Sequence, residues 1–316
     1  KNEQKEYDML KFSPIALPIN PNIKINGTIP ENTIVFKSAK YPVKYTFTVT
    51  NESQEFIKSE DPSVFQIIFK YGDDLRQDQL VLQIISYMDR LLKNVHLDFN
   101  FTTYKVLATS KADGFVEFVS NSTPIQDILQ KNDDQIAPFI RENSNNDFDK
   151  RLDHFITSCA GYCVVTYILG IGDRHLENLL MDKQGKLFHI DFGFILGKDP
   201  KPLPPPMKLC KQMVEAMGGK NSKGYEEFKK KCVDAYLCLR TNTRIIVNMF
   251  YLMIHSGLNQ LSENHEVALN KLHEKFVPNF NPQEASNSLL NKLEESVNAF
   301  YPYLMEEFHV WANYFK

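Results

Sequence analysis

The sequence lacks the marks of several large protein classes. No apolar run reaches the roughly 18–20 residues that a membrane-spanning helix needs, and residues 1–6 are polar and charged, with no signal-peptide core. The five cysteines form no CxxC pair, which argues against a structural zinc site. No internal repeat is visible. With 43% apolar and 24% charged residues, the composition is typical of a globular domain.

A strong charge of one sign is also missing. The formal net charge is −3, which gives no general case for nucleic acid, so we expect no nucleic-acid partner. Cys159 and Cys163 are four residues apart and would share one face of a helix. We expect them to be reduced packing residues, because free cysteine behaves as a small hydrophobic side chain. A cytosolic or cytosol-facing location is the expectation that follows.

The 316 residues suffice for two lobes with a real core. Residues 1–30 are rich in turns and prolines, and we interpret them as a linker strap from an upstream domain. Short β-type runs predict a β-rich small lobe over 31–118. A mostly helical large lobe is expected over 119–316, apart from a polar surface loop at 130–149. The fold class is therefore α+β, with a cleft between the two lobes.

Lys70 is the first candidate for phosphate binding. Residues 65–69 alternate, which places Lys70 on the face opposite the aromatic side chains of its strand. A lone lysine is more often solvated, but the following Gly-Asp-Asp-Leu-Arg-Gln-Asp favours a contact with nucleotide phosphates. Asp78 opens the next helix, either as its N-cap or to orient Lys70. A G-x-G-x-x-G loop is absent, and the weak substitute is the segment 36–40 around Ser38.

Two short motifs in the large lobe are the most informative part of the chain. They are Gly-Asp-Arg-His-Leu-Glu-Asn at 172–178 and Asp-Phe-Gly at 191–193. Protein kinases order a similar set as His-Arg-Asp, Asn and Asp-Phe-Gly, whereas the first triplet here is reversed. Asn178 and Asp191 offer oxygen ligands for Mg²⁺, which needs few protein ligands because phosphates and water supply the rest. The set predicts metal-dependent phosphoryl transfer.

The identity of the catalytic base stays open between two neighbours. His175 has an ordinary pKa of about 6.5 and accepts a proton near neutrality. Asp173 is the alternative, as base or as the group that orients the nucleophile. We favour His175 for the proton and Asp173 for orientation. Arg174 either neutralises phosphate charge or ties the loop to its neighbours.

These motifs together resemble the phosphatidylinositol 3-/4-kinase family. The similarity rests on Lys70–Asp78, on 172–178 and on 191–193, and it covers about residues 20–316. The proline-rich run 199–209, with Ser-Cys-Ala-Gly-Tyr-Cys upstream, is most similar to the class III 3-kinases. The resemblance implies a two-lobed protein-kinase-like fold that uses ATP with Mg²⁺ or Mn²⁺. It also implies a catalytic loop at 170–180 and an activation loop at 191–209.

The resemblance further implies contacts with the nucleotide. Ser38 would belong to the phosphate loop, and Glu117 and Val119 to the hinge whose backbone bonds adenine, with Phe118 beside them. Other residues would line the phosphates, the back of the pocket and the adenine faces, although the apolar ones are equally plain core residues: Lys70, Asp78, Tyr104, Ile68, Met181 and Ile190.

The activation loop is expected to select the lipid. It carries Lys198, Lys201 and Lys208 against Asp199. Each headgroup phosphate needs a compensating cation, so three spread lysines fit the single bridging phosphate of phosphatidylinositol. The 3-hydroxyl as acceptor rests on the resemblance alone. A phosphatidylinositol 4-kinase and a related Ser/Thr protein kinase are the alternatives; a catalytically silent scaffold is disfavoured by the intact motifs.

The C-terminal end is expected to form an amphipathic helix over 303–316. Phe308, Trp311 and Phe315 recur at helical spacing, which suits a bilayer interface or packing against the large lobe. The resemblance implies a cytoplasmic enzyme, peripheral on endosomal or autophagic membranes, that acts on phosphatidylinositol in vesicle trafficking and autophagy. It also implies adaptor or pseudokinase regulatory subunits, bound mainly through domains absent from this sequence.

Overall fold

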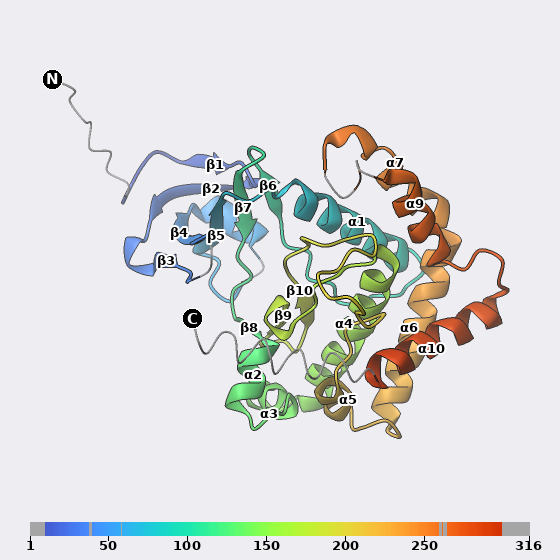
Figure 1. Ribbon diagram of the computed structural model, residues 1–316. Coiled ribbons are helices and arrows are strands. Elements are labelled where there is room, and N and C mark those ends of the chain that lie inside the picture. Colours follow the sequence, from blue (N-terminus) through green and yellow to red (C-terminus); the bar gives the residue numbers. More distant parts are fainter. Residues whose placement is uncertain (1–9, 38–39, 58, 259–260, 262–263, 299–316) are drawn as a thin grey trace. The chain divides into compact units, whose positions relative to one another are not determined.

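The computed structural model describes residues 10–37, 40–57, 59–258, 261 and 264–298. The chain divides into two compact units (Figure 1). Unit 1 comprises residues 1–82 and 103–120, and unit 2 comprises residues 83–102 and 121–316. The mixture of a β-rich unit and a largely helical unit agrees with the predicted α+β class.

Unit 1 is built on an antiparallel sheet with the order β1-β2-β4-β5-β7-β6, in which β3 also pairs with β4. Its strands are β1 (Ile15–Leu17), β2 (Asn20–Thr28), β3 (Ile34–Val35), β4 (Val43–Val49), β5 (Val64–Tyr71), β6 (Val106–Ala108) and β7 (Asp113–Glu117). Two short 3₁₀ helices join them, η1 (Pro30–Asn32) and η2 (Asn51–Phe56). Helix α1 (Arg76–Lys93) starts in this unit and continues into unit 2.

The sheet has one core face. Phe65 and Ile67 of β5 are buried there with Ile23 and Ile25 of β2 and Val49 of β4. Side chains alternate between faces along a strand, so Lys70 lies on the other face, as predicted. Burial of this aliphatic and aromatic set, at about 25 cal/mol per Å² of apolar surface, is the main source of stability for the unit.

The expectation of a plain linker strap over residues 1–30 differs from the structure. β1 pairs with β2, and β2 pairs with β4, so residues 15–28 extend the sheet. Leu17 and Ile23 contribute to its core. The prolines misled the prediction because they lie outside the hydrogen-bonded positions, at turns and strand ends, where the missing N–H costs nothing.

Unit 2 combines helices with a small antiparallel sheet of order β10-β9-β8. The strands are β8 (Ser122–Pro124), β9 (Leu179–Asp182) and β10 (Leu187–His189). The helices are α2 (Ile125–Lys131), α3 (Ala137–Glu142), α4 (Phe148–Leu169), α5 (Lys211–Ala216), α6 (Lys223–Thr241), α7 (Thr243–Tyr251), α9 (His265–Glu274) and α10 (Pro282–Asn298), with 3₁₀ helices η3 (Leu176–Asn178) and η4 (Ile254–Ser256).

Helix α4 is the centre of unit 2. Asp147 caps its start by accepting from the Lys150 N–H, and Gly170 ends it in the left-handed conformation, at φ 57°. Every residue from Phe155 to Leu169 is buried, and α4 packs against α6 and β10. By length and composition α4 would qualify as a membrane span, but 83% of its most apolar window is buried in the protein. This burial indicates that α4 is the core helix of unit 2.

Two smaller expectations have different outcomes. Cys159 and Cys163 are buried and unbridged on α4, which confirms the packing role. The polar loop expected at 130–149 instead contains α3 and buries Ile136 and Ile140. These two apolar residues are four positions apart, so they share one side of the short helix, which packs against α4.

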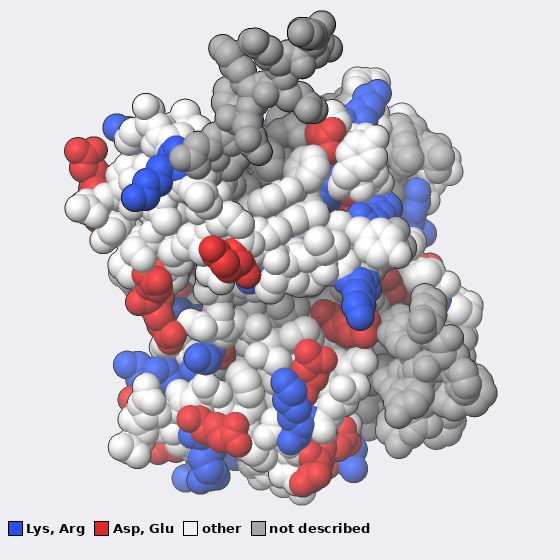
Figure 2. All heavy atoms as spheres, turned by 90° about the vertical axis from the view of Figure 1, so that its left-hand side faces the viewer, with Lys and Arg blue, Asp and Glu red and all other residues white. Residues whose placement is uncertain are grey.

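Charges of both signs are mixed on the described part of the face in Figure 2. Lysine and arginine side chains alternate there with aspartate and glutamate, in keeping with the small net charge of −3. Such a surface creates no strong field of one sign over that face.

Candidate active site

The catalytic loop begins where α4 ends. Gly172 lies two residues after the C-cap Gly170. A Cβ at Gly172 would lie 2.3 Å from the Lys198 carbonyl oxygen, so only glycine lets the loop pass this close to the Lys198 backbone. The Gly172 N–H donates to the Phe194 carbonyl at 2.9 Å. The loop and the segment after Asp-Phe-Gly are therefore fastened together at their backbones.

Two carboxylates of the site stand on strained backbone. Asp173 and Asp191 have positive φ values of 54° and 59°, which a non-glycine residue adopts only when the surroundings impose it. The Asp173 N–H donates to the Asp199 carboxylate at 2.8 Å, and Asp191 Oδ1 accepts from the Gly193 N–H at 3.2 Å. Side-chain and backbone bonds thus hold both residues in an unfavourable conformation, as is frequent at functional sites.

Arg174 holds the loop from inside. Its side chain is buried, and it donates to the carbonyl oxygens of Gly172 at 2.8 Å and Ile190 at 2.7 Å, and to that of Asp191. The guanidinium carbon lies 5.7 Å from the centre of the Phe192 ring. Of the two roles left open from the sequence, this geometry favours the tie, because the donors are directed at backbone carbonyls of the two motifs.

The two candidate bases are adjacent. The His175 backbone N–H donates to the Asp173 carbonyl at 3.1 Å, and the ring nitrogen His175 Nδ1 lies 3.7 Å from a Glu177 carboxylate oxygen. Burial raises the pKa of Asp173, with Asp191 and Asp199 adding to the rise and Arg174 opposing it. A carboxylate whose pKa is raised is a better proton acceptor. Asp173 and His175 therefore both remain candidates for the catalytic base.

Asn178 and Asp191 fit a divalent cation. The Asn178 amide nitrogen donates to the Asp173 carbonyl at 3.1 Å, which fixes the amide and leaves Oδ1 as its ligand atom. Asp191 is exposed, and the Ile190 N–H bonds the Asn178 carbonyl at 3.0 Å, joining the two ligand segments. In the described part of the chain no group of three or more His, Cys, Asp or Glu forms a metal cluster. Two oxygens suit Mg²⁺, since it takes its other ligands from phosphate and water.

Asp199 is a positioning residue that sequence reasoning missed. It was counted only as a negative charge in the activation loop. In the structure its Oδ2 accepts from the Asp173 N–H at 2.8 Å, and its Oδ1 accepts from the Lys201 N–H at 2.8 Å. Nothing in the local sequence announces this, because the partner lies 26 positions away.

The three lysines expected to contact the lipid have different environments. Lys198 is exposed and Lys201 is half-buried. Lys208 is only 6% exposed, and burial, with Lys201 and Arg174 nearby, lowers its pKa to about 8. The expectation for Lys208 is therefore corrected: its ammonium is enclosed in unit 2 and is not presented to a headgroup. Buried Met207 and Leu209 flank it and hold the chain down.

The other expected groups lie in unit 1. The register pairs Lys44 with Ile68, Ile68 with Val116 and Lys70 with Gly114. Alternation then places Ile68 and Lys70 on the face opposite the core, together with Phe118 just beyond β7. Lys70 Nζ lies 3.7 Å from the Asp73 carboxylate, which also binds Lys40 at 2.9 Å.

Asp78 lies in the first turn of α1 and does not open it, since the helix begins at Arg76. Tyr104 is buried. The Glu117 N–H donates to the Lys105 carbonyl at 2.8 Å, and the Phe118 N–H donates to the Gln66 carbonyl at 3.0 Å. These two hinge N–H groups are thus already used by the sheet. Val119 is half-buried.

Of the apolar adenine candidates, Ile68 and Ile190 are half-buried, whereas Met181 is completely buried in β9. Full burial agrees with the core interpretation that the sequence had left open for Met181. Ser38 lies outside the described residues, as do Phe308, Trp311 and Phe315 of the expected C-terminal helix.

Lys44 is a second residue that the sequence analysis missed. It is 9% exposed on β4, opposite Ile68, and its Nζ lies 4.6 Å from the centre of the Phe118 ring. Burial lowers its pKa. Side chains alternate along β4, so Lys44 shares its face of the strand with Thr46 and Thr48. That alternation is the sequence signal that could have identified Lys44.

The fold and this loop define the class of protein: a kinase-like domain with a reversed Asp-Arg-His catalytic triplet. The family model described as "Phosphatidylinositol 3- and 4-kinase" matches residues 64–263. The chain therefore belongs to the phosphatidylinositol 3- and 4-kinase family, which confirms the resemblance.

Individual relatives are similar to this chain over nearly its whole length. The chain is 45% identical to a "Phosphatidylinositol 3-kinase, nodule isoform" of Glycine max over 96% of its own length and 37% of the relative. It is 45% identical to "Phosphatidylinositol 3-kinase VPS34" of Arabidopsis thaliana, over 96% of this chain and 37% of the relative. Identity to the Saccharomyces cerevisiae protein of that name is 42%, over 99% and 35%. The chain thus spans a little over a third of the curated relatives it matches.

Proposed function

We propose that this chain is the catalytic domain of a lipid kinase that transfers the γ-phosphate of ATP to the 3-hydroxyl of phosphatidylinositol. The observation that carries the proposal is the fastening of the two motifs by Arg174, which brings Asp173, Asn178 and Asp191 onto one bonded framework. The matched relatives are named phosphatidylinositol 3-kinases, and that supports the choice of reaction.

The roles of the residues follow from their chemistry. Asn178 and Asp191 would hold a divalent cation, Mg²⁺ or Mn²⁺, which when bound neutralises phosphate charge. Asp173 and His175 would orient the acceptor hydroxyl and take its proton. Asp199 and Arg174 would keep these groups in place, so that positioning is prepared before the substrate arrives. Lys70 would bind the nucleotide phosphates from the sheet of unit 1.

The nucleotide base is proposed to contact the same face of the sheet. Ile68 would pack on the adenine, beside the hinge residues Glu117, Phe118 and Val119. Lys44 adds a cation to this face, and we propose that it contacts the base or the ribose. Its position over Phe118 and opposite Ile68 supports this role.

The lipid is proposed to be recognised by the activation loop, with Lys198 and Lys201 as its cations. Two lysines compensate the one bridging phosphate of phosphatidylinositol better than they would a polyphosphorylated headgroup. Action at endosomal or autophagic membranes, and regulation by adaptor or pseudokinase subunits, belong to the same proposal. They rest on the family alone.

Lipid turnover tests the proposal. The chain would be mixed with ATP, Mg²⁺ and phosphatidylinositol vesicles, and the position of the new phosphate would be identified. Phosphate at the 3-position is expected. Phosphate at the 4-position would make it a 4-kinase, the specific alternative within the matched family. A preference for bisphosphorylated phosphatidylinositol over phosphatidylinositol would contradict the charge argument for Lys198 and Lys201.

A further inference from the structure

A pocket of about 340 Å³ lies in unit 2, and neither Asn178 nor Asp191 is among its lining residues. Its lining comes from the end of α4, the segment after Asp-Phe-Gly and the end of α9: Ile168, Gly170, Leu196, Gly197, Lys271, Leu272, Glu274 and Lys275. We call it the α9 pocket. Its volume is within the range of small-molecule sites, about 300–1,000 Å³.

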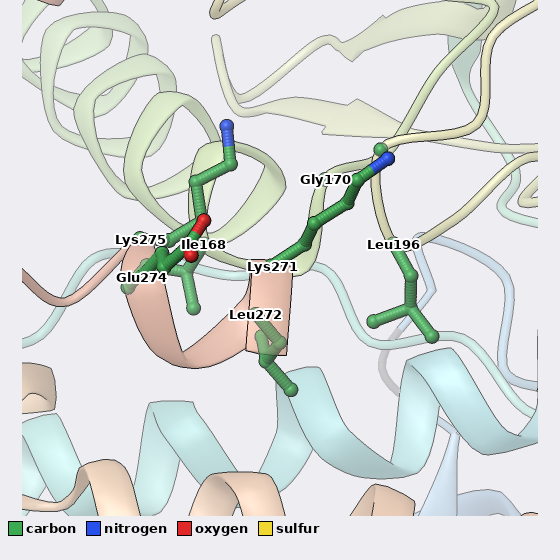
Figure 3. A pocket seen from close by; sticks show the side chains of 8 residues that line it. Ile168, Gly170, Leu196, Lys271, Leu272, Glu274 and Lys275 are labelled. Carbon is green, nitrogen blue, oxygen red and sulfur yellow. The ribbon is translucent and has the colours of Figure 1, made fainter. Parts of the chain in front are cut away.

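The chemistry of the α9 pocket is divided between floor and rim. Ile168, Leu196 and Leu272 are buried apolar residues that form the floor. Figure 3 shows the Lys271 ammonium beside Gly170, and the Lys275 ammonium directed toward α4 from the same helix end. Lys275 Nζ lies 4.6 Å from the centre of the Tyr167 ring, so this lysine is held in place by an aromatic face.

Two lysines and one carboxylate, that of Glu274, line the rim, so its net charge is positive. Within the described part of the chain, neither Lys271 nor Lys275 forms an ion pair, whereas Lys292 on α10 is paired with Glu295 at 2.9 Å. Burial, with Lys292 and Lys271 nearby, lowers the pKa of Lys275. Because one carboxylate does not balance two ammonium groups, an anion would be attracted to the rim.

The pocket also touches a strained part of the activation segment. Leu196 and Gly197 both have positive φ, 57° and 80°. Their N–H groups donate to the carbonyls of Leu169 and Gly170, each at 2.9 Å. A molecule in the pocket would contact Gly170 and Gly197, both partners of the second bond, and would therefore stabilise this conformation of the segment.

We propose that the α9 pocket binds a phosphomonoester carried on a small polyhydroxylated molecule. The two ammonium groups outnumber the single Glu274 carboxylate, and the net positive rim would attract a phosphomonoester, whose charge is about −2. Glu274 at the rim would accept hydrogen bonds from hydroxyl groups of the carrier. The apolar floor would receive the C–H face of the carrier. The phosphomonoester could belong to a soluble polyol phosphate or to a lipid headgroup, and the chemistry is the same.

Calorimetry with myo-inositol 1-phosphate tests the soluble source. The whole chain would carry Lys198→Gln and Lys201→Gln, so that the proposed lipid site does not contribute. Binding is expected, and adding Lys271→Gln and Lys275→Gln should weaken it at least about tenfold, because the charge-assisted hydrogen bonds to the phosphate are lost. Lysine-to-arginine changes at both positions should retain binding.

Lys211→Gln is the matched control. Lys211 is an exposed lysine of the same unit, paired with Glu215 at 3.3 Å, and its loss should leave the affinity unchanged. The thermal midpoint of each variant would be recorded to exclude unfolding. Sedimentation with phosphatidylcholine vesicles, with or without phosphatidylinositol 4-phosphate, tests the lipid source. Binding to these vesicles that disappears with Lys271 and Lys275 would assign the pocket to a headgroup.

Amide hydrogen exchange shows where on the chain the probe binds. The amides of Leu196 and Gly197 should exchange more slowly when the probe is bound, and only while Lys271 and Lys275 are present. Absence of binding to both probes, or equal binding by the Lys271→Gln, Lys275→Gln variant, would overturn the proposal. No step needs ATP turnover, and Asp191→Ala should bind the probe normally, so a failure of the proposed kinase reaction would be recognised separately.

Discussion

The catalytic loop of unit 2 and the outer face of the sheet in unit 1 place their charged groups by different means. In the loop, the Asp173 backbone N–H is held by the Asp199 carboxylate, and the Arg174 side chain is held by backbone carbonyls such as that of Ile190. On the sheet, Lys44 and Lys70 are placed by strand register, and each has few polar contacts. Losing one group from the loop should therefore disturb its neighbours, whereas losing one from the sheet should affect only its own contact.

The largest effect is expected for Asp191→Ala. Loss of the carboxylate removes one of two proposed metal oxygens, and charge stabilisation of this kind is worth on the order of several kcal/mol in the barrier. Turnover of phosphatidylinositol, measured by radiolabelled phosphate transfer, should fall about 10³-fold or more. Activity within about tenfold of wild type would remove Asp191 from the mechanism.

Arg174→Met tests how strongly the hydrogen bonds of the loop stabilise the fold. Methionine leaves the carbonyls of Gly172, Ile190 and Asp191 without their donor, and buried unsatisfied groups cost about 1–3 kcal/mol each. We expect unfolding free energy to fall by about 2–4 kcal/mol in urea titration, together with a lower kcat. Arg76→Met is the control, because Arg76 pairs with Asp74 at the surface; its stability should stay within about 0.5 kcal/mol. Equal losses of unfolding free energy in the two variants would show that the carbonyl bonds of Arg174 stabilise the fold no more than a surface ion pair does.

Lys208 provides a pH-dependent test. Its folded pKa is about 8 against an ordinary value of 10.5, so between these pH values the unfolded chain binds a proton that the folded chain does not. Stability should therefore rise with pH across this window, by about 3 kcal/mol at most. Lys208→Met should be more stable than wild type near neutrality and should lose this rise. Urea midpoints at pH about 7.5 and about 9.5 give the comparison; an identical slope in both proteins would contradict the assignment.

The smallest effect is expected for Lys44→Gln. If the sheet face acts through single contacts, the KM for ATP should rise about three- to tenfold with little change in kcat, since a desolvated cation–π contact and a hydrogen bond are each worth about 1 kcal/mol. Lys24→Gln is the control, because Lys24 is exposed and lies 4.0 Å from Glu52. A large fall in kcat with unchanged KM would show that Lys44 acts on the loop residues and not on the nucleotide.

Sequence reasoning succeeded where neighbours in the chain are also neighbours in space. The alternation of β5 and the shared helix face of Cys159 and Cys163 follow from local rules. It failed where distant segments meet. The burial of Lys208 depends on α4 and α10 covering the segment, as in the Cys163 thiol near the Lys208 carbonyl and the Met207 N–H bond to Ser296 at 3.0 Å. No local pattern distinguishes that lysine from exposed Lys198.

What the sequence by itself determined is which chemical groups the motifs carry: an ammonium on a strand, the reversed Asp-Arg-His triplet, and the two side-chain oxygens proposed to hold a divalent cation, all in short contiguous motifs. Which charged groups remain available was decided only by the tertiary structure. Arg174 is committed to three carbonyls, Lys208 is enclosed, and Lys44 is brought against Phe118. The physical reason is that desolvation depends on every segment that covers a side chain, and those segments are far apart in the sequence.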